Sequence, residues 1–276
     1  MVRKLDSDMR CTYNDIIVDQ LNRQFIREVL DDDVTCGHYL PHHPVRKDSP
    51  TTPIRIVYDP SCRTAGRPSL NDCLEPGPNL LNDFGRILLR FRTHPVGLSS
   101  DIQKAFLHVK LADADQMFTE FLWLADPEDP ESRFRTFQFQ LVPFGTVSSP
   151  FMLLATIKTH LDSYDTPLAA DIQENTYMDN IFASVQPTDA MTYYEKANEM
   201  MDDARLKLRA WTSNDVTIRQ RAHADNIDDP KPKVPALGMI WDIEADTLTY
   251  NKRNKPQTLQ PTKREARSGQ LHLRKI

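Results

Sequence analysis

The sequence predicts an α+β fold in which an antiparallel sheet is backed by helices. Two hairpin patterns, at residues 176–185 and 236–250, alternate along the chain with stretches whose apolar residues recur at helical spacing. Hairpins separated by helices, without internal repeats, favour antiparallel pairing. Twenty prolines against eight glycines indicate rigid connections in place of long uninterrupted helices. A chain of 276 residues can bury one large core or two smaller subdomains.

The composition argues against a globally basic coat and against a membrane span. The formal net charge is −5, so any surface that binds a polyanion must be local. The longest apolar run, residues 151–157, is too short for a bilayer, and no signal-like stretch follows the N-terminus. The cysteines (Cys11, Cys36, Cys62 and Cys73) form no C-x-x-C pair. We therefore expect an intracellular, cytoplasmic protein with reduced thiols and no membrane partner.

The N-terminal region is predicted to begin with a helix. Asn14 can cap a helix that runs to Leu30. Its buried stripe would be formed by Ile17, Leu21, Phe25 and Val29. Residues 36–44 then carry one thiol and three histidines, but their spacing matches no usual zinc site. A rigid extended loop with partly solvated histidines is the favoured interpretation.

A locally basic region follows, in which residues 46–110 hold ten Lys and Arg against six Asp and Glu. Within it, residues 53–59 are typical of a strand that presents Arg55. An arginine on a strand can bind a phosphate in a bidentate manner, although by itself the pattern favours a solvated strand face. A helical face from Leu80 to Phe91 comes next.

The central region is predicted to contain a strand that enters Asp101 and, after a turn, a short helix that carries Phe106. Residues 137–142 alternate as in a half-buried strand. Ser149 and Pro150 then suit the cap and first turn of a helix. Further helical spacing spans residues 187–208, ahead of the second hairpin.

The hairpin at residues 176–185 places Asp179 at its tip, beside Asn180. A carboxylate there suits a divalent cation, although Asp-Asn is also ordinary turn chemistry. Asp101 supplies a second carboxylate that could neighbour Asp179 in one sheet. Two such carboxylates can hold two Mg²⁺ ions roughly 3.5–4 Å apart, as in nucleotidyl transfer.

Eight motifs in order resemble a known family. They are residues 39–45; 55–59; 69–72 with 76–80; 101–106; 142–145 with 148–151; 177–180; 208–214; and 237–241. Each motif is common by itself, but their order is specific. The series resembles the reverse transcriptase domain of retrotransposons, most closely that of the BEL/Pao group of LTR elements, over roughly residues 35–265.

The resemblance implies a right-hand polymerase with fingers and palm. The ranges are an N-terminal helical lead-in at 1–34, fingers at 35–95 and 118–150, palm at 96–117 and 151–255, and a truncated thumb start or tail at 256–276. The implied activity is an RNA-directed DNA polymerase that adds dNTPs to a primer on an RNA or DNA template. Its cofactor would be two Mg²⁺ ions, with Mn²⁺ as an alternative. The resemblance also adds a virus-like particle or the nucleus to the cytoplasm as an expected location.

The resemblance also assigns residues to roles. Asp101 and Asp179 match the catalytic metal-binding aspartates, with Asn180 beside them and Tyr177 and Met178 completing the motif. The residues that match contacts to the incoming nucleotide are Arg55, Lys47, Phe106, Phe144 and Gly145. Phe106 matches the aromatic gate that excludes a 2′-hydroxyl. The primer grip corresponds to Leu237, Gly238 and Met239.

Several positions depart from the family pattern. Asn180 replaces the second aspartate of the usual Y-x-D-D and so removes one negative charge, while Gln103 and Thr146 are tolerable changes. Residues 262–265 resemble the start of the thumb helix, but residues 266–276 do not continue it. An alternative is therefore a catalytically weak or inactive retroelement remnant that at most binds nucleic acid. An unrelated metal-dependent nuclease or phosphotransferase is a more distant alternative.

Overall fold

The computed structural model describes residues 5–30, 37–46 and 54–250 of the chain. The predictions for Lys47 and for the segment 256–276 lie outside these residues. The chain divides into two compact units, the first ending at Pro230 and the second beginning at Lys231.

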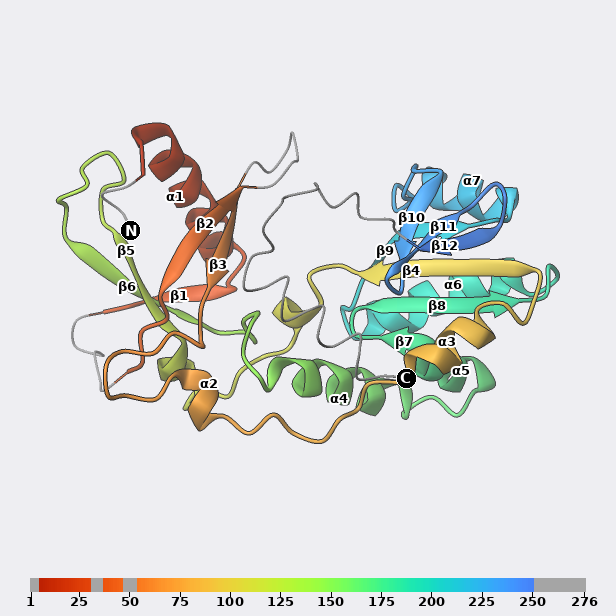
Figure 1. Ribbon diagram of the computed structural model, residues 1–276, viewed down its shortest axis with the longest axis horizontal. Helices are drawn as coiled ribbons and strands as arrows, with labels where there is room; N and C mark the ends of the chain where they lie inside the picture. The colour runs from red at the N-terminus through yellow and green to blue at the C-terminus, as the bar shows by residue number, and fades with distance from the viewer. Residues whose placement is uncertain (1–4, 31–36, 47–53, 251–276) are drawn as a thin grey trace, which may run out of the picture. The chain divides into compact units, whose positions relative to one another are not determined.

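A four-stranded antiparallel sheet lies at the centre of the first unit. Its strands, in spatial order, are β7 (Thr176–Tyr177), β8 (Asn180–Val185), β4 (Val96–Ile102) and β9 (Leu208–Ser213). The helices that contact these strands are α3 (Phe84–Arg90), α5 (Pro167–Asn175), α6 (Ala190–Asp203) and α7 (Val216–Ala224), as Figure 1 shows. The expectation of an antiparallel sheet backed by helices is confirmed.

Two smaller sheets also belong to the first unit. One contains β1 (Ile26–Val29), β6 (Phe134–Phe139) and β5 (Glu120–Leu124) in that order, and the other pairs β2 (His42–Arg46) with β3 (Ile54–Tyr58). Helix α1 (Ser7–Asn22) contacts β1 and β3. The strand predicted around Arg55 is thus present as β3.

One continuous hydrophobic core runs through the first unit. On the three-stranded sheet it includes Phe121, Trp123 and Phe137, all at most 2% exposed. Tyr13 of α1 stacks on Trp123 with ring centroids 4.4 Å apart. The same core extends to the four-stranded sheet and to helix α4 (Ser149–Leu161). The remaining short helices are α2 (Leu70–Cys73), η3 (Ala105–His108) and η4 (Gln116–Thr119).

The second unit contains three antiparallel strands, β10 (Lys233–Ala236), β11 (Met239–Asp242) and β12 (Thr247–Tyr250). Leu237 and Gly238 form the tight turn between the first two strands, and both have positive φ angles. Trp241 is fully buried. The predicted second hairpin is therefore present, with one additional strand before it.

The predicted N-terminal helix is wrong in its boundaries. Helix α1 begins after Asp6, whose carboxylate accepts the Met9 backbone N–H at 2.8 Å, so Asn14 is not its cap. It ends at Asn22, because Gln24 adopts a left-handed φ of 58° and the chain then enters β1. Val29 consequently lies on a strand opposite Thr136 instead of on the helix.

Other boundaries also differ from the predictions. The helix predicted over 187–208 covers only Ala190–Asp203, because Arg205 has a φ of 58° and Leu208 begins β9. Ser148 occupies the cap position of α4, one residue before the predicted Ser149, whose hydroxyl donates to the Pro143 carbonyl instead. Elements α5, α7 and β5 have no counterpart among the predicted elements. Strand β5 is largely buried on both faces, which removes the alternation that marks a half-exposed strand.

The histidine-rich segment is more ordered than the predicted loop. His42 belongs to β2, where its Nδ1 pairs with the Tyr13 hydroxyl and its Nε2 with the Leu122 carbonyl at 2.9 Å. In the described part of the chain, Cys11, Cys62 and Cys73 are free cysteines. None of the described helices combines the length and the apolar character that a membrane span needs.

Candidate active site

The hairpin of β7 and β8 carries Asp179 in a two-residue turn. Tyr177 pairs with Asn180, so Met178 and Asp179 form the turn and Asn180 is the first residue of β8. Met178 has a φ of 60°, a conformation usually taken by glycine at this place in a hairpin. A non-glycine residue there costs about 1 kcal/mol or more, and such strain is typical of functional sites. The predicted position of Asp179 at the tip agrees with this geometry.

The sheet brings Asp101 to the same place. Asp101 on β4 lies directly opposite Asn180 on β8, and the neighbouring Ile102 N–H donates to the Asp179 carbonyl at 2.7 Å. Burial raises the pKa of the Asp101 carboxyl, Arg209 opposes this shift, and the charge of Asp179 raises the pKa further. The two carboxylates are therefore close enough to influence one another.

Each carboxylate already accepts a hydrogen bond from a neighbouring side chain. Arg209 on β9 contacts Asp101 Oδ2 through Nε at 2.9 Å and through Nη2 at 2.8 Å. The Asn180 amide donates to Asp179 Oδ1 at 2.8 Å. Both aspartates thus present hard oxygen ligands, one of them paired with a guanidinium cation.

This donor set suits a divalent cation such as Mg²⁺, which is often held by one or two carboxylates together with substrate phosphates. The Arg209 guanidinium forms an ion pair with Asp101, which shows that this carboxylate stabilises a positive charge beside it. Among the described residues, no cluster of three or more His, Cys, Asp or Glu side chains could hold a metal ion. The site therefore offers two carboxylates and the amide oxygen of Asn180.

A second group of predicted residues lies together around Phe144. The Phe106 and Phe144 ring centroids are 4.5 Å apart, and the Arg55 guanidinium carbon is 5.1 Å from the Phe144 centroid. Phe106 is 6% exposed, whereas Phe144 is 41% exposed. Phe144 thus presents a ring to solvent between a buried aromatic side chain and a cationic side chain.

A cavity of about 720 Å³ adjoins this group. Arg55, Phe144 and Gly145 line it together with Lys104. From helix α1 and the residue that follows it, the polar side chains that line it are Thr12, Asp15, Asp19, Gln20 and Arg23. A volume of this size is typical of small-molecule sites. Asp101 and Asp179 do not line the cavity. Phe106, which packs against Phe144 beside the cavity, follows Asp101 by five residues and so links the aromatic group to the carboxylate pair along the chain.

Gly145 is held by the segment around Asn71. Its φ of 98° favours glycine, and an added Cβ would lie 3.3 Å from Pro60 Cδ. The Asn71 amide donates to the Gly145 carbonyl at 3.0 Å, while its oxygen accepts the Val147 N–H at 3.0 Å. Asn71 therefore fixes the backbone on both sides of residue 146.

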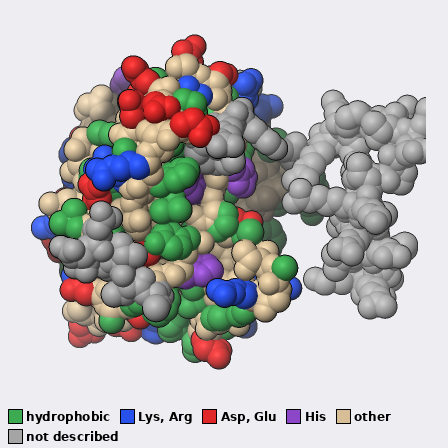
Figure 2. Space-filling model, turned by 90° about the vertical axis from the view of Figure 1, so that its left-hand side faces the viewer, with side chains coloured by type: hydrophobic (Ala, Val, Ile, Leu, Met, Phe, Trp, Pro, Cys, Tyr) green, Lys and Arg blue, Asp and Glu red, His purple; other side chains and the backbone are tan. Residues whose placement is uncertain are grey.

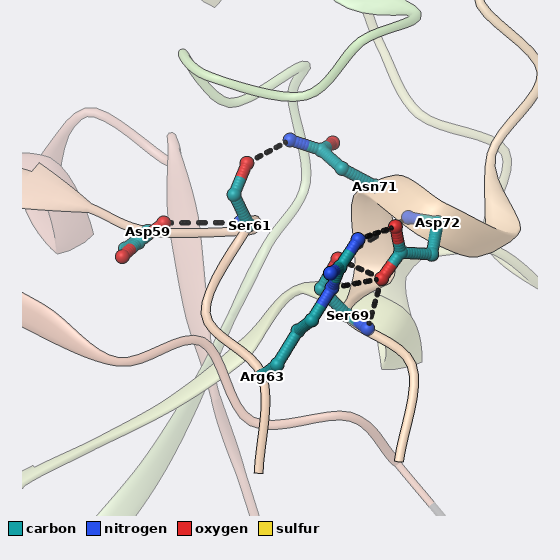
Figure 3. A network of polar contacts seen from close by, with 6 residues as sticks. All are labelled: Asp59, Ser61, Arg63, Ser69, Asn71 and Asp72. Atoms are coloured by element: carbon teal, nitrogen blue, oxygen red, sulfur yellow. Dashed lines mark hydrogen bonds and ion pairs between the residues drawn. The ribbon is translucent and has the colours of Figure 1, made fainter. Parts of the chain in front are cut away.

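A network of polar contacts orients Asn71, as Figure 3 shows. Asn71 also donates to the Ser61 hydroxyl at 2.8 Å, and Arg63 makes two hydrogen bonds to Asp72 at 2.7 and 2.6 Å. Ser69 and Asp72 form a capping box at the start of α2. Hydrogen bonds from Arg63 and Ser69 hold the pKa of Asp72 well below its usual range. The network fixes the short helix from which Asn71 projects.

We expect Asn71→Ala to release the loop at Gly145. The substitution removes both hydrogen bonds to that loop, each contributing about 1 kcal/mol, so amide exchange at Val147 should accelerate about thirtyfold. Hydrogen exchange measured by NMR checks this. Asn71→Asp is the matched control, because it keeps the acceptor for Val147 and should protect that amide. Equal exchange in Asn71→Ala and the parent protein would contradict the anchoring role.

The other predicted residues are placed as follows. The Tyr177 ring lies edge-on to Phe84, with centroids 6.5 Å apart. Leu237, Gly238 and Met239 belong to the second unit, as the turn and the first residue of β11. Three residues of the candidate site were not predicted as site residues: Arg209, Asn71 and Lys104. Arg209 and Asn71 make contacts across 108 and 74 residues of sequence, which no local pattern reveals.

The surface of the first unit near β5 and β6 carries exposed hydrophobic side chains. Figure 2 shows hydrophobic side chains gathered on this face, with acidic side chains clustered at its upper end. The exposed hydrophobic residues on these two strands include Leu122 and Phe134.

The helices and antiparallel sheets define a class: a mixed α/β protein whose fold is similar to that of retroviral reverse transcriptases. The chain is similar to the foamy viral protease-reverse transcriptase in complex with dsDNA, with a TM-score of 0.62 and 16% identity over 96% of this chain and 48% of that one. A foamy viral protease-reverse transcriptase in complex with an RNA/DNA hybrid gives a TM-score of 0.62 and 15% identity, over 97% of this chain and 31% of that one. For the native prototype foamy virus protease-reverse transcriptase, the TM-score is 0.56 and the identity is 16%, over 90% of this chain and 26% of that one.

The chain spans less than half the length of these three proteins. At such low identity, the similarity establishes the fold and does not extend to activity. No protein-family model matches the sequence. No curated protein matches it either.

Proposed function

We propose that the chain is an RNA-directed DNA polymerase domain of a retrotransposon of the BEL/Pao type. The observation that carries the proposal is the position of Asp101 on β4 beside the turn that carries Asp179, where Asp101 lies opposite Asn180 and the Ile102 N–H donates to the Asp179 carbonyl. The reverse-transcriptase-like fold supports the same reading. Its foamy viral neighbours were solved with dsDNA or with an RNA/DNA hybrid, which supports a template–primer duplex as the partner.

In this proposal, Asp101 and Asp179 hold two Mg²⁺ ions, or Mn²⁺ in their place, and Asn180 contributes an amide oxygen. When bound, such ions lower the pKa of an attacking 3′-hydroxyl and neutralise the departing pyrophosphate. The carboxylates orient this chemistry because the sheet fixes one of them on β4 and the other in the turn before β8. Tyr177 and Met178 shape that turn.

The cavity beside Phe144 is the proposed site for the incoming dNTP. Arg55 is suited to the triphosphate, since a guanidinium can bind phosphate oxygens in a bidentate manner. Phe106, buried against Phe144, would lie beneath the sugar and exclude a 2′-hydroxyl. Lys47 would assist Arg55, and Gly145 would keep the pocket backbone close to the nucleotide.

The finer domain assignment belongs to the same proposal. Residues 35–95 and 118–150 would be fingers, residues 96–117 and 151–255 would be palm, and Leu237, Gly238 and Met239 would grip the primer end. Residues 1–34 would be the N-terminal lead-in, and residues 256–276 would be the start of the thumb or an irregular tail.

Primer extension on an RNA template with Mg²⁺ or Mn²⁺ tests the activity. We expect extension by the parent protein and a loss of about a hundredfold or more in Asp101→Asn and in Asp179→Asn. Asp113→Asn is the control, because Asp113 is highly exposed and pairs with Lys110 away from the site. Activity that is insensitive to both site substitutions would refute the catalytic assignment.

The same experiment separates the alternative function. Asn180 leaves two carboxylates in place of the three that a Y-x-D-D motif would supply with Asp101, which favours weakened metal use. A parent protein that binds template–primer without extending it would identify a nucleic-acid-binding remnant.

A further inference from the structure

Arg209 is the only side chain that the structure pairs with Asp101 by hydrogen bond or ion pair within the described residues. Its Nε and Nη2 both contact the same carboxylate oxygen, Oδ2, at 2.9 and 2.8 Å. The Asp101 side chain is 25% exposed, so the ion pair is partly shielded from solvent, while Arg209 is 52% exposed and can move into water. A partly buried carboxylate with a mobile cation on it can exchange that cation for another.

The backbone is arranged to bring Arg209 to this position. Strands β4 and β9 are in regular register from Leu98 to Ser99, but the register shifts by one residue before Asp101, which then faces Arg209. The extra residue lies in β9, where Ala210 has a φ of 52°. Ser100 Oγ donates to the Arg209 carbonyl at 3.0 Å and ties the distorted segment to β4.

The bulge carries a conformational cost. Alanine in the left-handed region is less stable by about 1 kcal/mol than in an ordinary strand conformation. In a regular ladder, Asp101 would face Ala210, which offers no charge. The distortion therefore exchanges an uncharged neighbour for a guanidinium beside the carboxylate.

We propose that Arg209 competes with the divalent cation for Asp101, so that the guanidinium must leave Oδ2 before the cation binds there. This inference rests on the proposed function, since it takes Asp101 as a metal ligand. Arg209 lowers the affinity of the site for the free cation and keeps Asp101 paired while the cation is absent. Once released, the guanidinium lies at the edge of the four-stranded sheet, where its N–H groups can donate hydrogen bonds to another oxygen anion.

The competition makes a reciprocal prediction. If Arg209 weakens cation binding, then the cation weakens the contact of Arg209 with Asp101 by the same factor. The two effects are measurable separately, one on the cation and one on the arginine.

Mn²⁺ binding, followed by the loss of the free-ion EPR signal, tests the first effect in the full chain. We expect Arg209→Gln to bind Mn²⁺ about three- to fivefold more tightly than the parent protein, the upper part of the range that an ion pair of this exposure supports. Lys207→Gln is the matched control: it removes the same charge two residues away on the chain, where the lysine lies 3.9 Å from Asp202. Its affinity should stay within about twofold of the parent value.

NMR of the arginine Nε–H groups tests the second effect. Mg²⁺ should accelerate solvent exchange at Arg209, whereas Arg135, which pairs with Glu28, should not respond. An Arg209→Gln affinity equal to or weaker than that of Lys207→Gln would overturn the competition while leaving the metal site intact. Mn²⁺ binding that Asp101→Ala leaves unchanged would overturn the metal site, and the competition with it.

Discussion

Replacing Asn180 with aspartate is expected to tighten Mn²⁺ binding by about tenfold or more. Asn180 lies opposite Asp101 and donates its amide to Asp179 Oδ1 at 2.8 Å, so it occupies one oxygen of a carboxylate that is proposed as a metal ligand. An aspartate removes that donor and adds a negative charge near the cation, where a unit charge at a few ångströms contributes about 1 to 4 kcal/mol depending on solvent exposure. Titration with Mn²⁺ followed by EPR measures the change.

The cation-free protein should respond in the opposite direction. A third carboxylate beside Asp101 and Asp179 repels both, so Asn180→Asp is expected to unfold at lower urea concentration without Mg²⁺ and to recover stability with it. Asn180→Ala separates the two causes, because it removes the amide donor without adding charge. If Asn180→Ala binds Mn²⁺ as tightly as Asn180→Asp, the added charge is not responsible. If neither variant binds more tightly, the amide does not limit metal use.

Trp211→Ala is expected to lower the free energy of unfolding by about 3–5 kcal/mol. Trp211 is 1% exposed, packs edge-on against Tyr194 with ring centroids 4.9 Å apart, and donates its indole N–H to Asn198 at 3.1 Å. The truncation therefore leaves a cavity and an amide oxygen without its donor. Because Trp211 lies two residues from Arg209 on β9, the substitution should also loosen the strand beside Asp101.

Urea unfolding followed by far-UV circular dichroism measures this loss without depending on tryptophan fluorescence. Phe134→Ala is the matched control, since Phe134 is an aromatic strand residue that is 55% exposed, and its removal should cost about 0.5 kcal/mol or less. A loss below about 1 kcal/mol for Trp211→Ala would show that β9 does not depend on this side chain.

The features that could be predicted from the sequence are those with local causes. The β7–β8 hairpin follows from β-forming residues on both sides of a turn, and the strand that carries Arg55 follows from its β-branched neighbours. Asp101 and Asp179 could be paired because both were assigned to the same sheet. Their register, with Asp101 opposite Asn180, became visible only in the structure.

The remaining features depend on contacts that the sequence does not display. The apolar spacing of Ile17 and Leu21 continues through Phe25 and Val29, although the helix ends at Asn22, because a period of four does not reveal a left-handed residue at Gln24. Arg209 faces Asp101 only through a one-residue bulge. Asn71 reaches Gly145 from a helix of four residues whose start is fixed by a capping box.

The bulge in β9 has a consequence for self-association. Strand β9 is at one edge of the four-stranded sheet, where unpaired backbone groups could add a strand from a second molecule. The backbone of Trp211 makes two hydrogen bonds to the segment 227–229. Its N–H donates to the Ile227 carbonyl at 2.8 Å, and its carbonyl accepts the Asp229 N–H at 3.1 Å. Next to Trp211 in the sequence, the left-handed backbone at Ala210 interrupts the regular strand edge of β9. The segment 227–229 and the bulge together leave no long, flat strand edge on β9 open to intermolecular β-sheet growth.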